Sequence, residues 1–552
     1  MKRIEYIKIS LLALFTVMIA GCTDFDDLNR DPTTSTNMAP DLQIPTIQLF
    51  QTNETDMWHR FFIYPGGFMD QWTQDWATVW YGGTGVKNKD YFAFYWDMYY
   101  MKTIKNAVDL EMRTRGIAEY TNINAMARIL KVQNFLRLTD LYGDIPYFDA
   151  GTALETGNFT PKYDTQKDIY DDFFKTLEEA ANSLSKEFPQ AKYDLYYNGD
   201  IDKWKRLANS LRLRIAMRLI KVDKARAEKE VQAAVAGGVF TSNDDICYVK
   251  HGKKESGVVA SEGNAVSNLF FKHINFCFSR ELIMTMEELG DPRIRYYGTS
   301  RLDNGPPGSN TLGTDITDLM IEIIPTLPWD FPTPEEGRGK KYWELTIPAR
   351  SYSYELPVGE WRGEVTLMIG GQEVIVSRVE QVLRPSQYIV NWDAPYIHLS
   401  YAEVEFLLAE ACVRGYIAGD AKTHFKNGLE AAVNQWKLFG VNVSADAVSD
   451  FVAKNDLKTG NQALEQIGTQ LWVLNVLDPL ETWSNWRRMG QPEIKPYAEG
   501  KGDNSEGQLP RRIEYPMTEQ VSNHKEWRKA VDRMGGVDSW LSRVWWDVDV
   551  KE

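Results

Sequence analysis

Aromatic side chains are concentrated near the N-terminal end of the sequence. Between Trp58 and Tyr100, 16 of 43 positions are Phe, Trp or Tyr, which indicates either an unusually aromatic core or a binding face. Exposed indole and phenol rings offer flat apolar faces that can stack on the C–H side of a sugar ring, and planar polar side chains beside them can pair with hydroxyl groups. This stretch therefore carries the first candidate site.

Within this stretch, the segment GGFMDQWTQDWATVWYGG places an aromatic residue at every fourth position, at Phe68, Trp72, Trp76 and Trp80. In a helix these side chains share one side, but four steps of about 100° overshoot a turn by about 40°, so the rings cannot all face the same surface. We expect Phe68 and Trp72 to pack in the core. The candidate ligand contacts are Trp76, Trp80 and Tyr81, with Asp75 and Gln74 as polar companions.

A second group of aromatic residues lies where the sequence is rich in Gly and Pro. Trp329, Phe331 and Trp343 stand in and just after LPWDFPTPEEG, and a loop can expose a ring without disturbing a core. Trp329 and Trp343 are therefore further candidate ligand contacts. By contrast, YFAFYWDMYYMKTIKNA continues the four-residue spacing through Trp96 and Tyr100 into an ordinary amphipathic pattern, which predicts core packing.

Few residues suit catalysis or a cofactor. The six His form no HxxxH pair, and neither a GxSxG nor a GxxxxGK[ST] motif is present. Asp244-Asp245 and Asp303-Asn304 could hold Ca²⁺, but neither has EF-hand spacing, and solvated aspartates are the simpler interpretation. We expect no catalytic residue, metal or cofactor, although the abundant carboxylates leave open a glycosidase pair, which needs carboxyl groups about 5 to 9.5 Å apart.

The first residues form a signal-peptide pattern. Three basic residues among the first eight precede the uncharged run 9–20, which is too short to span a membrane and is followed by Gly21-Cys22. We expect residues 1–21 to be removed and Cys22 to be lipidated; an ordinary secretory signal with a chance cysteine is the alternative. Residues 22–51 lack periodicity and predict a flexible acidic tether to a single domain at 52–552.

Charge and cysteine content narrow the partners. The net charge of −15 disfavours nucleic acids and anionic membranes, because attraction to phosphate supplies most non-specific affinity for them. Neutral ligands fit this surface better. Apart from Cys22, the chain has only Cys247, Cys277 and Cys412, without CxxC spacing, so we expect buried free thiols rather than disulfides or a zinc site.

Several segments have the apolar periodicity of amphipathic helices. The clearest are NINAMARILKVQNFLRLTDLY, ending at Gly143; YDTQKDIYDDFFKTLEEAANSL, with Asp164 or Thr165 as N-cap; DKWKRLANSLRLRIAMRL; SYAEVEFLLAEACVRGY; AKTHFKNGLEAAVNQWKLFG; and NQALEQIGTQLWVLN. Paired helices with short connections are typical of tetratricopeptide-like solenoids. Four arginines of the third segment should cover or ion-pair with neighbouring acidic helices: Arg206, Arg212, Arg214 and Arg218.

A region of different texture interrupts the helices at about 296–392. It contains the Gly/Pro clusters DNGPPGSN and LPWDFPTPEEG, which make helix unlikely. Within it, EVTLMIGGQEVIVSRV alternates apolar residues on both sides of Gly370-Gly371, a pattern that predicts a β-hairpin. The expected fold class is mainly α, with an irregular and β insertion.

The order of several motifs resembles the SusD/RagB-like outer-membrane lipoproteins. The motifs are the lipobox with CTDFDDLNRDP, NFLRLTDLYGDIPY, KWKRLANSLRLRIAMRL, SRELIMTMEELGDPRIRYY, YIHLSYAEVEFLLAEA and RRIEYPMTEQVSNHKEW. The last one points to the SusD-like, starch-binding-associated subgroup. The resemblance implies about four degenerate tetratricopeptide-like units and an irregular ligand-bearing half. It also implies that Asp24, Asp26 and Asp27 form an export signal to the outer leaflet; a merely solvated linker is the alternative.

The resemblance further implies a function. Members of this family are non-enzymatic cell-surface lipoproteins that capture oligosaccharides and deliver them to a SusC-like, TonB-dependent transporter barrel in the outer membrane. Two alternatives stay open: a peptide ligand, as in the RagB branch, and a surface glycoside hydrolase with a carboxylate pair. Loop sequences in this family diverge, so no motif transfers the ligand contacts residue by residue.

Overall fold

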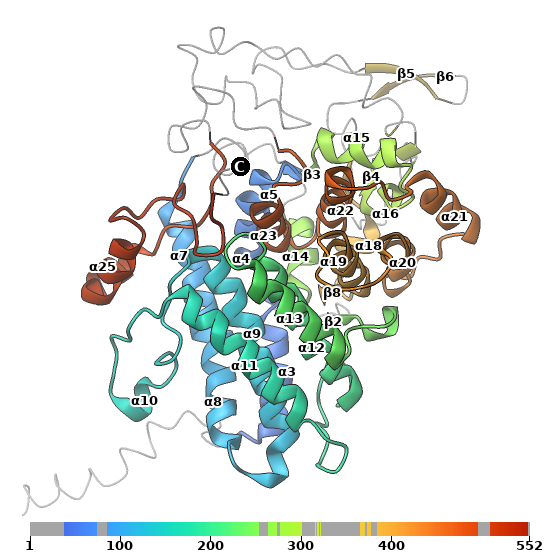
Figure 1. Cartoon of the computed structure of the whole chain (residues 1–552). Coiled ribbons are helices and arrows are strands. Elements are labelled where there is room, and N and C mark those ends of the chain that lie inside the picture. The colour runs from blue at the N-terminus through green and yellow to red at the C-terminus, as the bar shows by residue number, and fades with distance from the viewer. Residues whose placement is uncertain are drawn as a thin grey trace, which may run out of the picture.

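A computed structural model describes residues 38–73, 86–252, 263–272, 276–300, 315, 317–318, 321, 365–369, 372–376, 383–494 and 508–549. This part of the chain is mainly helical, as Figure 1 shows, and its strands form only two-stranded sheets. None of the helices in these ranges has the length and apolar character needed to cross a membrane. The fold class predicted from the sequence is confirmed.

The first half of the chain contains most of the long helices. Its elements are α3 (Pro40–Phe50), α4 (Thr55–Ile63), α5 (Pro65–Phe68), β1 (Trp72–Thr73), α7 (Lys89–Met98), the π-helix η2 (Tyr99–Ile104), α8 (Lys105–Thr114), η3 (Ala118–Tyr120), α9 (Thr121–Tyr142), α10 (Ala153–Thr156), α11 (Gln166–Ser183), α12 (Ile201–Arg218) and α13 (Lys224–Gly237).

The second half alternates short strands with helices. Its elements are η4 (Asn243–Asp245), β2 (Cys247–Lys250), α14 (Ala265–Lys272), β3 (Cys277–Phe278), α15 (Arg280–Leu289), α16 (Ile294–Tyr297), β4 (Gly298–Thr299), β5 (Val365–Ile369), β6 (Gln372–Val376), β7 (Arg384–Pro385), α18 (Gln387–Val390), β8 (Pro395–Leu399), α19 (Tyr401–Val413), α20 (Ala421–Asn434), η9 (Gln435–Phe439), α21 (Ala445–Lys454), α22 (Asn461–Leu474), α23 (Pro479–Met489), α24 (Met517–Ser522) and α25 (His524–Arg533).

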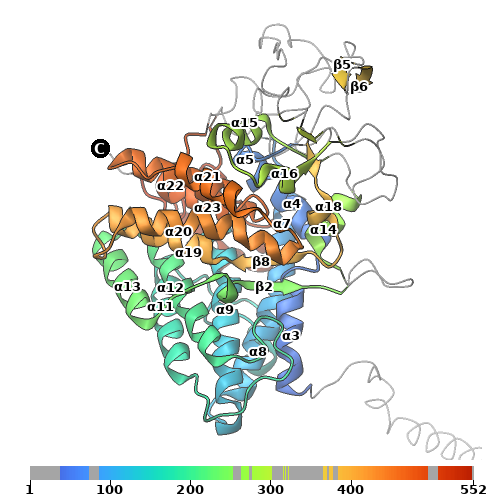
Figure 2. The ribbon, with the colours of Figure 1, turned by 90° about the vertical axis from the view of Figure 1, so that its right-hand side faces the viewer.

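Four helix pairs form the scaffold: α8 with α9, α11 with α12, α19 with α20, and α22 with α23. Figures 1 and 2 show the first two pairs together at one end of the molecule, and α19, α20, α22 and α23 beside them toward the other end. Contacts of α12 with both α19 and α23 join the two groups. The arrangement agrees with the expected tetratricopeptide-like units.

Local sequence signals set several helix ends as predicted. Helix α9 ends at Tyr142 because Gly143 takes a φ of +87°, a conformation that favours glycine. Helix α11 begins after Thr165, whose hydroxyl accepts a hydrogen bond from the N–H of Asp168 at 3.2 Å. Asp200 caps α12 in the same way.

The arginines of α12 pair with carboxylates on neighbouring elements, as the sequence predicted. Three of the four guanidinium groups are buried, so each needs a partner to offset the loss of hydration. The pairs are Arg206 with Asp245 at 2.9 Å, Arg212 with Glu230 at 2.6 Å, Arg214 with Glu403 at 2.7 Å and Arg218 with Glu481 at 2.6 Å.

The predicted tether is shorter than expected, because residues 40–50 form helix α3. Ile44 and Ile47 of this helix are fully buried, and the side chain of Gln48 donates a hydrogen bond to Asp194 at 2.7 Å. Helix α3 packs against α8 and α9. The prediction missed it because the turn-forming residues before it end only at Pro40. The ordered domain therefore begins before residue 52.

The aromatic residues at every fourth position do not share one helix. Helix α5 ends at Phe68, Asp70 adopts a φ of +54°, and Trp72 begins strand β1. Aspartate tolerates this left-handed conformation better than most residues, and the turn redirects the chain. Phe68 and Trp72 are 0% and 2% exposed, which confirms that they pack in the core.

The second aromatic stretch also packs as predicted. It forms α7 and continues through η2 into α8. Trp96 is buried, and its ring stacks on Tyr163 at a centroid distance of 5.7 Å and meets Tyr142 edge-on at 5.2 Å. These contacts tie the N-terminal helices to the loop before α11.

The predicted hairpin is present as the antiparallel pair β5–β6, in which Val365 lies opposite Val376 and Ile369 opposite Gln372. The other sheets join distant segments: β1 with β3, β2 with β8, and β4 with β7. Cys247 and Cys277 are buried free thiols as expected, whereas Cys412 is also free but partly exposed.

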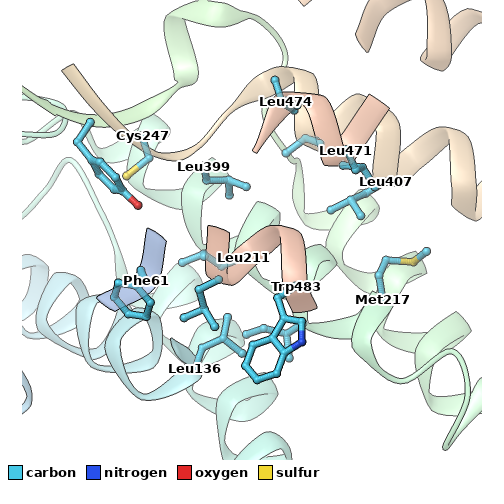
Figure 3. Packing of buried hydrophobic residues seen from close by; sticks show 14 of the residues in the cluster. Phe61, Leu136, Leu211, Met217, Cys247, Leu399, Leu407, Leu471, Leu474 and Trp483 are labelled. Atoms are coloured by element: carbon cyan, nitrogen blue, oxygen red, sulfur yellow. The ribbon is translucent and has the colours of Figure 1, made fainter. Parts of the chain in front are cut away.

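One hydrophobic cluster connects the helix pairs (Figure 3). The indole of Trp483 on α23 is completely buried, and the cluster around it draws on elements far apart in the sequence. Its members include Phe61 of α4, Leu136 of α9, Leu211 of α12, Leu407 of α19 and Leu471 of α22. This shared core gives a rigid base for the less regular segments.

Candidate functional site

All of the ligand contacts predicted from the sequence lie outside the described residues. They are Gln74, Asp75, Trp76, Trp80, Tyr81, Trp329 and Trp343. The predicted lipidation site Cys22 and the acidic residues Asp24, Asp26 and Asp27 also lie outside them. These assignments stay predictions, but the structure describes the residues from which segment 74–85 starts and at which it ends.

Segment 74–85 starts from a tightly packed aromatic cluster. The indole of Trp72 stacks on Phe270, with ring centroids 4.8 Å apart and an interplanar angle of 18°, and lies 4.4 Å from the ring of Phe278. Its Nε1 donates a hydrogen bond to the carbonyl oxygen of Val476 at 2.8 Å. These contacts fix the point at which the chain leaves β1.

The same segment ends at an anchored turn. The hydroxyl of Tyr64 accepts a hydrogen bond from the N–H of Asn88 at 2.9 Å and donates one to the carbonyl oxygen of Val86 at 3.4 Å. The side chain of Asn88 caps α7, and the ammonium group of Lys87 lies 2.6 Å from a carboxylate oxygen of Glu514. Both ends of the segment are thus held by the folded domain.

A cation–π cluster lies beside this anchor. The guanidinium carbon of Arg60 on α4 lies 4.5 Å from the ring centroid of Tyr91 and 4.2 Å from that of Phe94, both on α7. Such contacts are attractive when the cation lies within about 6 Å of the ring. The two rings are only partly buried, so α4 and α7 present a planar cation and ring edges together.

The described residues also form a small pocket between β8, η9 and the C-terminal end of α22, which we call the Trp436 pocket. Its volume is about 50 Å³. The aromatic residues lining it are Tyr297, Tyr396, Trp436 and Phe439, and the polar ones include Asn264, Gln435, Asn475 and Asp478. Phe439 and Asn475 are partly exposed and Ile397 and Leu477 beside them also line the pocket, so it opens toward solvent there.

Three residues of the Trp436 pocket carry buried polar atoms that make no hydrogen bond. The atoms are Oε1 of Gln435, Nε1 of Trp436 and Nδ2 of Asn475. Gln435 is 6% and Trp436 is 1% exposed. A buried polar group without a partner typically costs about 1–3 kcal/mol. The pocket therefore offers one acceptor and two donors that a bound group can satisfy.

The ionised state of the pocket is set by Asp478. Its two carboxylate oxygens accept hydrogen bonds from the guanidinium of Arg137 at 2.7 and 2.9 Å. Burial alone would raise the pKa of Asp478, but the charge and hydrogen bonds of Arg137 outweigh it and hold the pKa below its usual value. Burial raises the pKa of Tyr297 to about 12, so this phenol is neutral at pH 7.

The closest approach to a glycosidase-like carboxylate pair among the described residues is Glu403 and Glu481. Both bind Arg214, whose Nε lies 2.7 Å from Glu403 and 3.8 Å from Glu481. Their exposed fractions are 1% and 5%, so a substrate cannot reach them without unfolding the helices around them. This pair belongs to the scaffold.

Metal binding finds no constellation in the described ranges, where no three His, Cys, Asp or Glu side chains are arranged around a common point. Asp245, one of the residues considered for Ca²⁺, accepts a hydrogen bond from the hydroxyl of Thr241 at 2.9 Å and pairs with Arg206. Its carboxylate is therefore already engaged within the fold.

The sequence analysis did not anticipate the Trp436 pocket. Gln435 and Trp436 lie in a segment predicted only as an amphipathic helix, and the tryptophan looked like a core residue. The pocket forms because η9 meets β8 and the end of α22, which are separated from it in the sequence. An amide next to a tryptophan at the end of an apolar helix was the only available signal.

The comparison with protein families identifies the chain. A family described as "Starch-binding associating with outer membrane", SusD-like_2, matches residues 43–318 and 355–516. The chain belongs to this SusD-like family. The match begins within α3 and ends close to Pro516, so it includes all four helix pairs and the hairpin β5–β6. No match was found among curated proteins.

Solved structures agree with the SusD-like assignment. A chitin-binding protein has 34% identity and a TM-score of 0.75, covering 93% of this chain and 100% of that chain. A Bacteroidetes AC2a SusD-like protein has 26% identity and a TM-score of 0.79 over the same shares of the two chains. A chitin-binding SusD homologue from Flavobacterium johnsoniae shares the fold at 21% identity and a TM-score of 0.68, covering 93% of this chain and 99% of that one.

Proposed function

We propose that this protein is a cell-surface lipoprotein that binds oligosaccharides and delivers them to a TonB-dependent transporter barrel in the outer membrane. The observation that carries the proposal is the match to the starch-binding, outer-membrane-associated family over most of the chain. The 34% identity with a chitin-binding protein supports a carbohydrate ligand, and the lipobox with Cys22 supports attachment through a lipid.

In this proposal the ligand contacts come from the segments that the sequence singled out. Trp76, Trp80 and Tyr81 stack on sugar rings, Gln74 and Asp75 bind hydroxyl groups, and Trp329 and Trp343 contribute from the insertion. The anchors at Trp72 and Tyr64 support a site on segment 74–85, because they hold both of its ends.

The expected affinity is modest. Stacking on a few rings and a small number of hydrogen bonds leave little surplus after the entropy lost on binding, so a single site should bind with a dissociation constant of roughly micromolar or weaker. Several contacts with one polymer raise the overall affinity. Weak single-site binding suits a protein that must release its ligand to a transporter.

The proposal is tested by affinity electrophoresis in gels that contain soluble starch, glycol chitin or no polysaccharide, together with an assay for new reducing ends. We expect retardation by at least one polysaccharide and no new reducing ends. New reducing ends would favour a glycoside hydrolase. Binding of peptides without binding of any saccharide would favour the RagB-like alternative.

The stacking residues are tested with the double variant Trp76→Ala/Trp80→Ala. We expect at least a tenfold loss of affinity, since each stacked ring contributes about 0.5–1.5 kcal/mol beyond its buried area, with thermal stability near that of the wild type. Phe159→Ala is a matched control, because Phe159 is 77% exposed and lies outside both candidate segments. A large loss of stability in the double variant would instead assign the two residues to the core.

A further inference from the structure

The polar atoms of the Trp436 pocket define the kind of chemical group that it can bind. The side-chain oxygen Oε1 of Gln435 accepts a hydrogen bond, whereas the indole Nε1–H of Trp436 and the amide Nδ2–H of Asn475 donate one, and none of the three has a partner. A complementary group has one donor and an acceptor with two lone pairs. A secondary amide has this combination.

The rest of the lining adds an apolar requirement. The ring of Trp436 packs edge-on against Tyr297 with centroids 4.9 Å apart and lies 4.8 Å from Phe439, so the walls between the polar atoms are aromatic. These contacts also keep the indole from rotating. An occupant that fills the pocket therefore needs a small apolar part next to its polar atoms.

Size excludes a whole sugar ring. The volume of about 50 Å³ holds only a few water-sized groups, whereas pockets for entire small-molecule ligands typically measure about 300–1,000 Å³. Because Phe439 and Asn475 are partly exposed, a substituent can enter while the molecule that carries it stays outside. The occupant is thus a short side group of a larger ligand.

We propose that the Trp436 pocket binds the acetamido group of an N-acetylated sugar. The acetamido carbonyl accepts hydrogen bonds from Trp436 and Asn475, its N–H donates to Gln435, and its methyl group packs against the aromatic rings. This inference rests on the proposed glycan-binding function and names its substrate class, because it requires an oligosaccharide with N-acetylated units.

Charge argues against other substituents. The carboxylate of a uronic acid would lie near Asp478, which also lines the pocket and is ionised beside Arg137. An ammonium group gains little, because Arg137 already neutralises that carboxylate. A hydroxyl group could meet the donors and the acceptor but has no methyl group to fill the aromatic part. A neutral acetamido group satisfies all three conditions.

The test compares oligosaccharides that differ only in acetylation. Isothermal titration of the full-length mature protein uses chitotriose, its deacetylated counterpart and maltotriose. We expect chitotriose to bind at least tenfold more tightly than the deacetylated trimer, because the latter lacks the carbonyl acceptors and the methyl groups. Equal binding of the acetylated and deacetylated trimers would overturn the inference and leave a general glycan-binding function intact.

Variants then assign the selectivity to this pocket. Trp436→Phe removes one donor and keeps a ring, and Gln435→Met removes the acceptor at nearly constant volume. We expect each to weaken chitotriose binding about fivefold, the value of one net hydrogen bond, with little change for maltotriose. Trp527→Phe is the matched control, because Nε1 of Trp527 is also buried without a hydrogen bond but lies on α25, away from the pocket.

The variants also separate a ligand site from a merely structural one. Since the indole N–H of Trp436 has no partner in the free protein, Trp436→Phe should leave its thermal stability close to that of Trp527→Phe. Unchanged chitotriose affinity in both pocket variants would overturn the assignment to this pocket, while wild-type binding of chitotriose would still support the proposed function. Absence of binding to every saccharide would instead contradict the proposed function itself.

Discussion

Two regions of the core are held together by different interactions. Between the helix pairs, buried arginines bind buried carboxylates. The pairs are Arg137–Asp478, Arg214–Glu403, Arg218–Glu481 and Arg488–Glu410. Around β1, β3 and α14 the core is aromatic instead, and its rings are Phe62, Trp72, Phe270, Phe276 and Phe278.

This difference separates the scaffold from the base of the candidate site. An ion pair in the core has directional geometry, so it favours one register of the helices that carry it, and removing one partner is costly. An aromatic cluster is less directional and instead supplies a stiff apolar surface. The aromatic region is the one from which segment 74–85 starts, whereas the ion pairs lie between helices that belong to the repeated units.

The largest effect is expected where a buried ion pair is broken. Arg218→Met removes a guanidinium that is 1% exposed and binds both Asp140 and Glu481. The free energy of unfolding, measured by urea denaturation, should fall by about 3–5 kcal/mol, because the carboxylates stay buried without their cation.

A surface pair provides the control for this experiment. Lys422 and Asp456 lie 2.8 Å apart but have side chains that are 54% and 74% exposed, and Lys422→Met should change stability by less than about 1 kcal/mol. Similar losses in Arg218→Met and Lys422→Met would show that the buried pairs do not organise the scaffold.

Acid should destabilise the scaffold through the same ion pairs. Burial alone would raise the pKa values of Asp478, Glu410 and Glu481, but the neighbouring arginines outweigh it and hold all three pKa values below normal. Carboxylates of this kind stabilise the fold above their unfolded pKa of about 4–4.5, and the contribution is lost as the pH falls through the lower folded pKa.

The expected pH profile follows from these signs. Urea denaturation between pH 7 and pH 3 should show stability decreasing below about pH 4.5, by up to about 1.4 kcal/mol per pH unit for each group. Glu403 acts in the opposite direction, because burial raises its pKa, but it is outnumbered. The aromatic cluster contains no titrating side chain, so Phe270→Leu should keep the same profile. Stability that rises from pH 5 to pH 3 would contradict this account.

A smaller effect is expected in the aromatic region. Phe270→Leu removes the ring that stacks on Trp72 at 4.8 Å and retains an apolar side chain. We expect a loss of about 1–2 kcal/mol, since an aromatic pair contributes about 0.5–1.5 kcal/mol beyond its area and a nearly volume-conserving exchange costs little more. The measurement is urea denaturation followed by tryptophan fluorescence. A loss above 4 kcal/mol would mean that this cluster holds the whole fold.

The smallest effect is the coupling between the two regions. Phe270 and Arg218 share no partner among the described contacts, so their substitutions should be additive within about 0.5 kcal/mol in a double-mutant cycle. A larger interaction energy would show that the two regions form one cooperative unit rather than a scaffold and a separately built base.

The sequence predicts the parts of the fold that depend on local signals. Gly143 ends α9, Thr165 caps α11, and Gly370-Gly371 separates the strands of the hairpin, because glycine and capping residues act within a few positions. The arginines of α12 were also predictable as ion-pair partners, since an amphipathic helix with four arginines in an acidic chain needs nearby carboxylates.

Tertiary contacts explain what the sequence could not predict. Helix α3 follows a Pro- and Thr-rich stretch and forms because Ile44 and Ile47 are buried against α8 and α9. The turn at Asp70 separates Phe68 from Trp72 and breaks the expected helix. The Trp436 pocket joins residues from β8, η9 and α22, and no spacing within one segment reveals such a meeting. The predicted contacts of segment 74–85 stay untested.

The most direct test of the account is a crystal structure of the mature protein with a bound chito-oligosaccharide. We predict sugar rings stacked on Trp76, Trp80 or Tyr81, with one acetamido group in the Trp436 pocket or near its mouth. A structure in which the rings of residues 74–85 are sealed inside the fold, and the saccharide binds elsewhere or not at all, would contradict it.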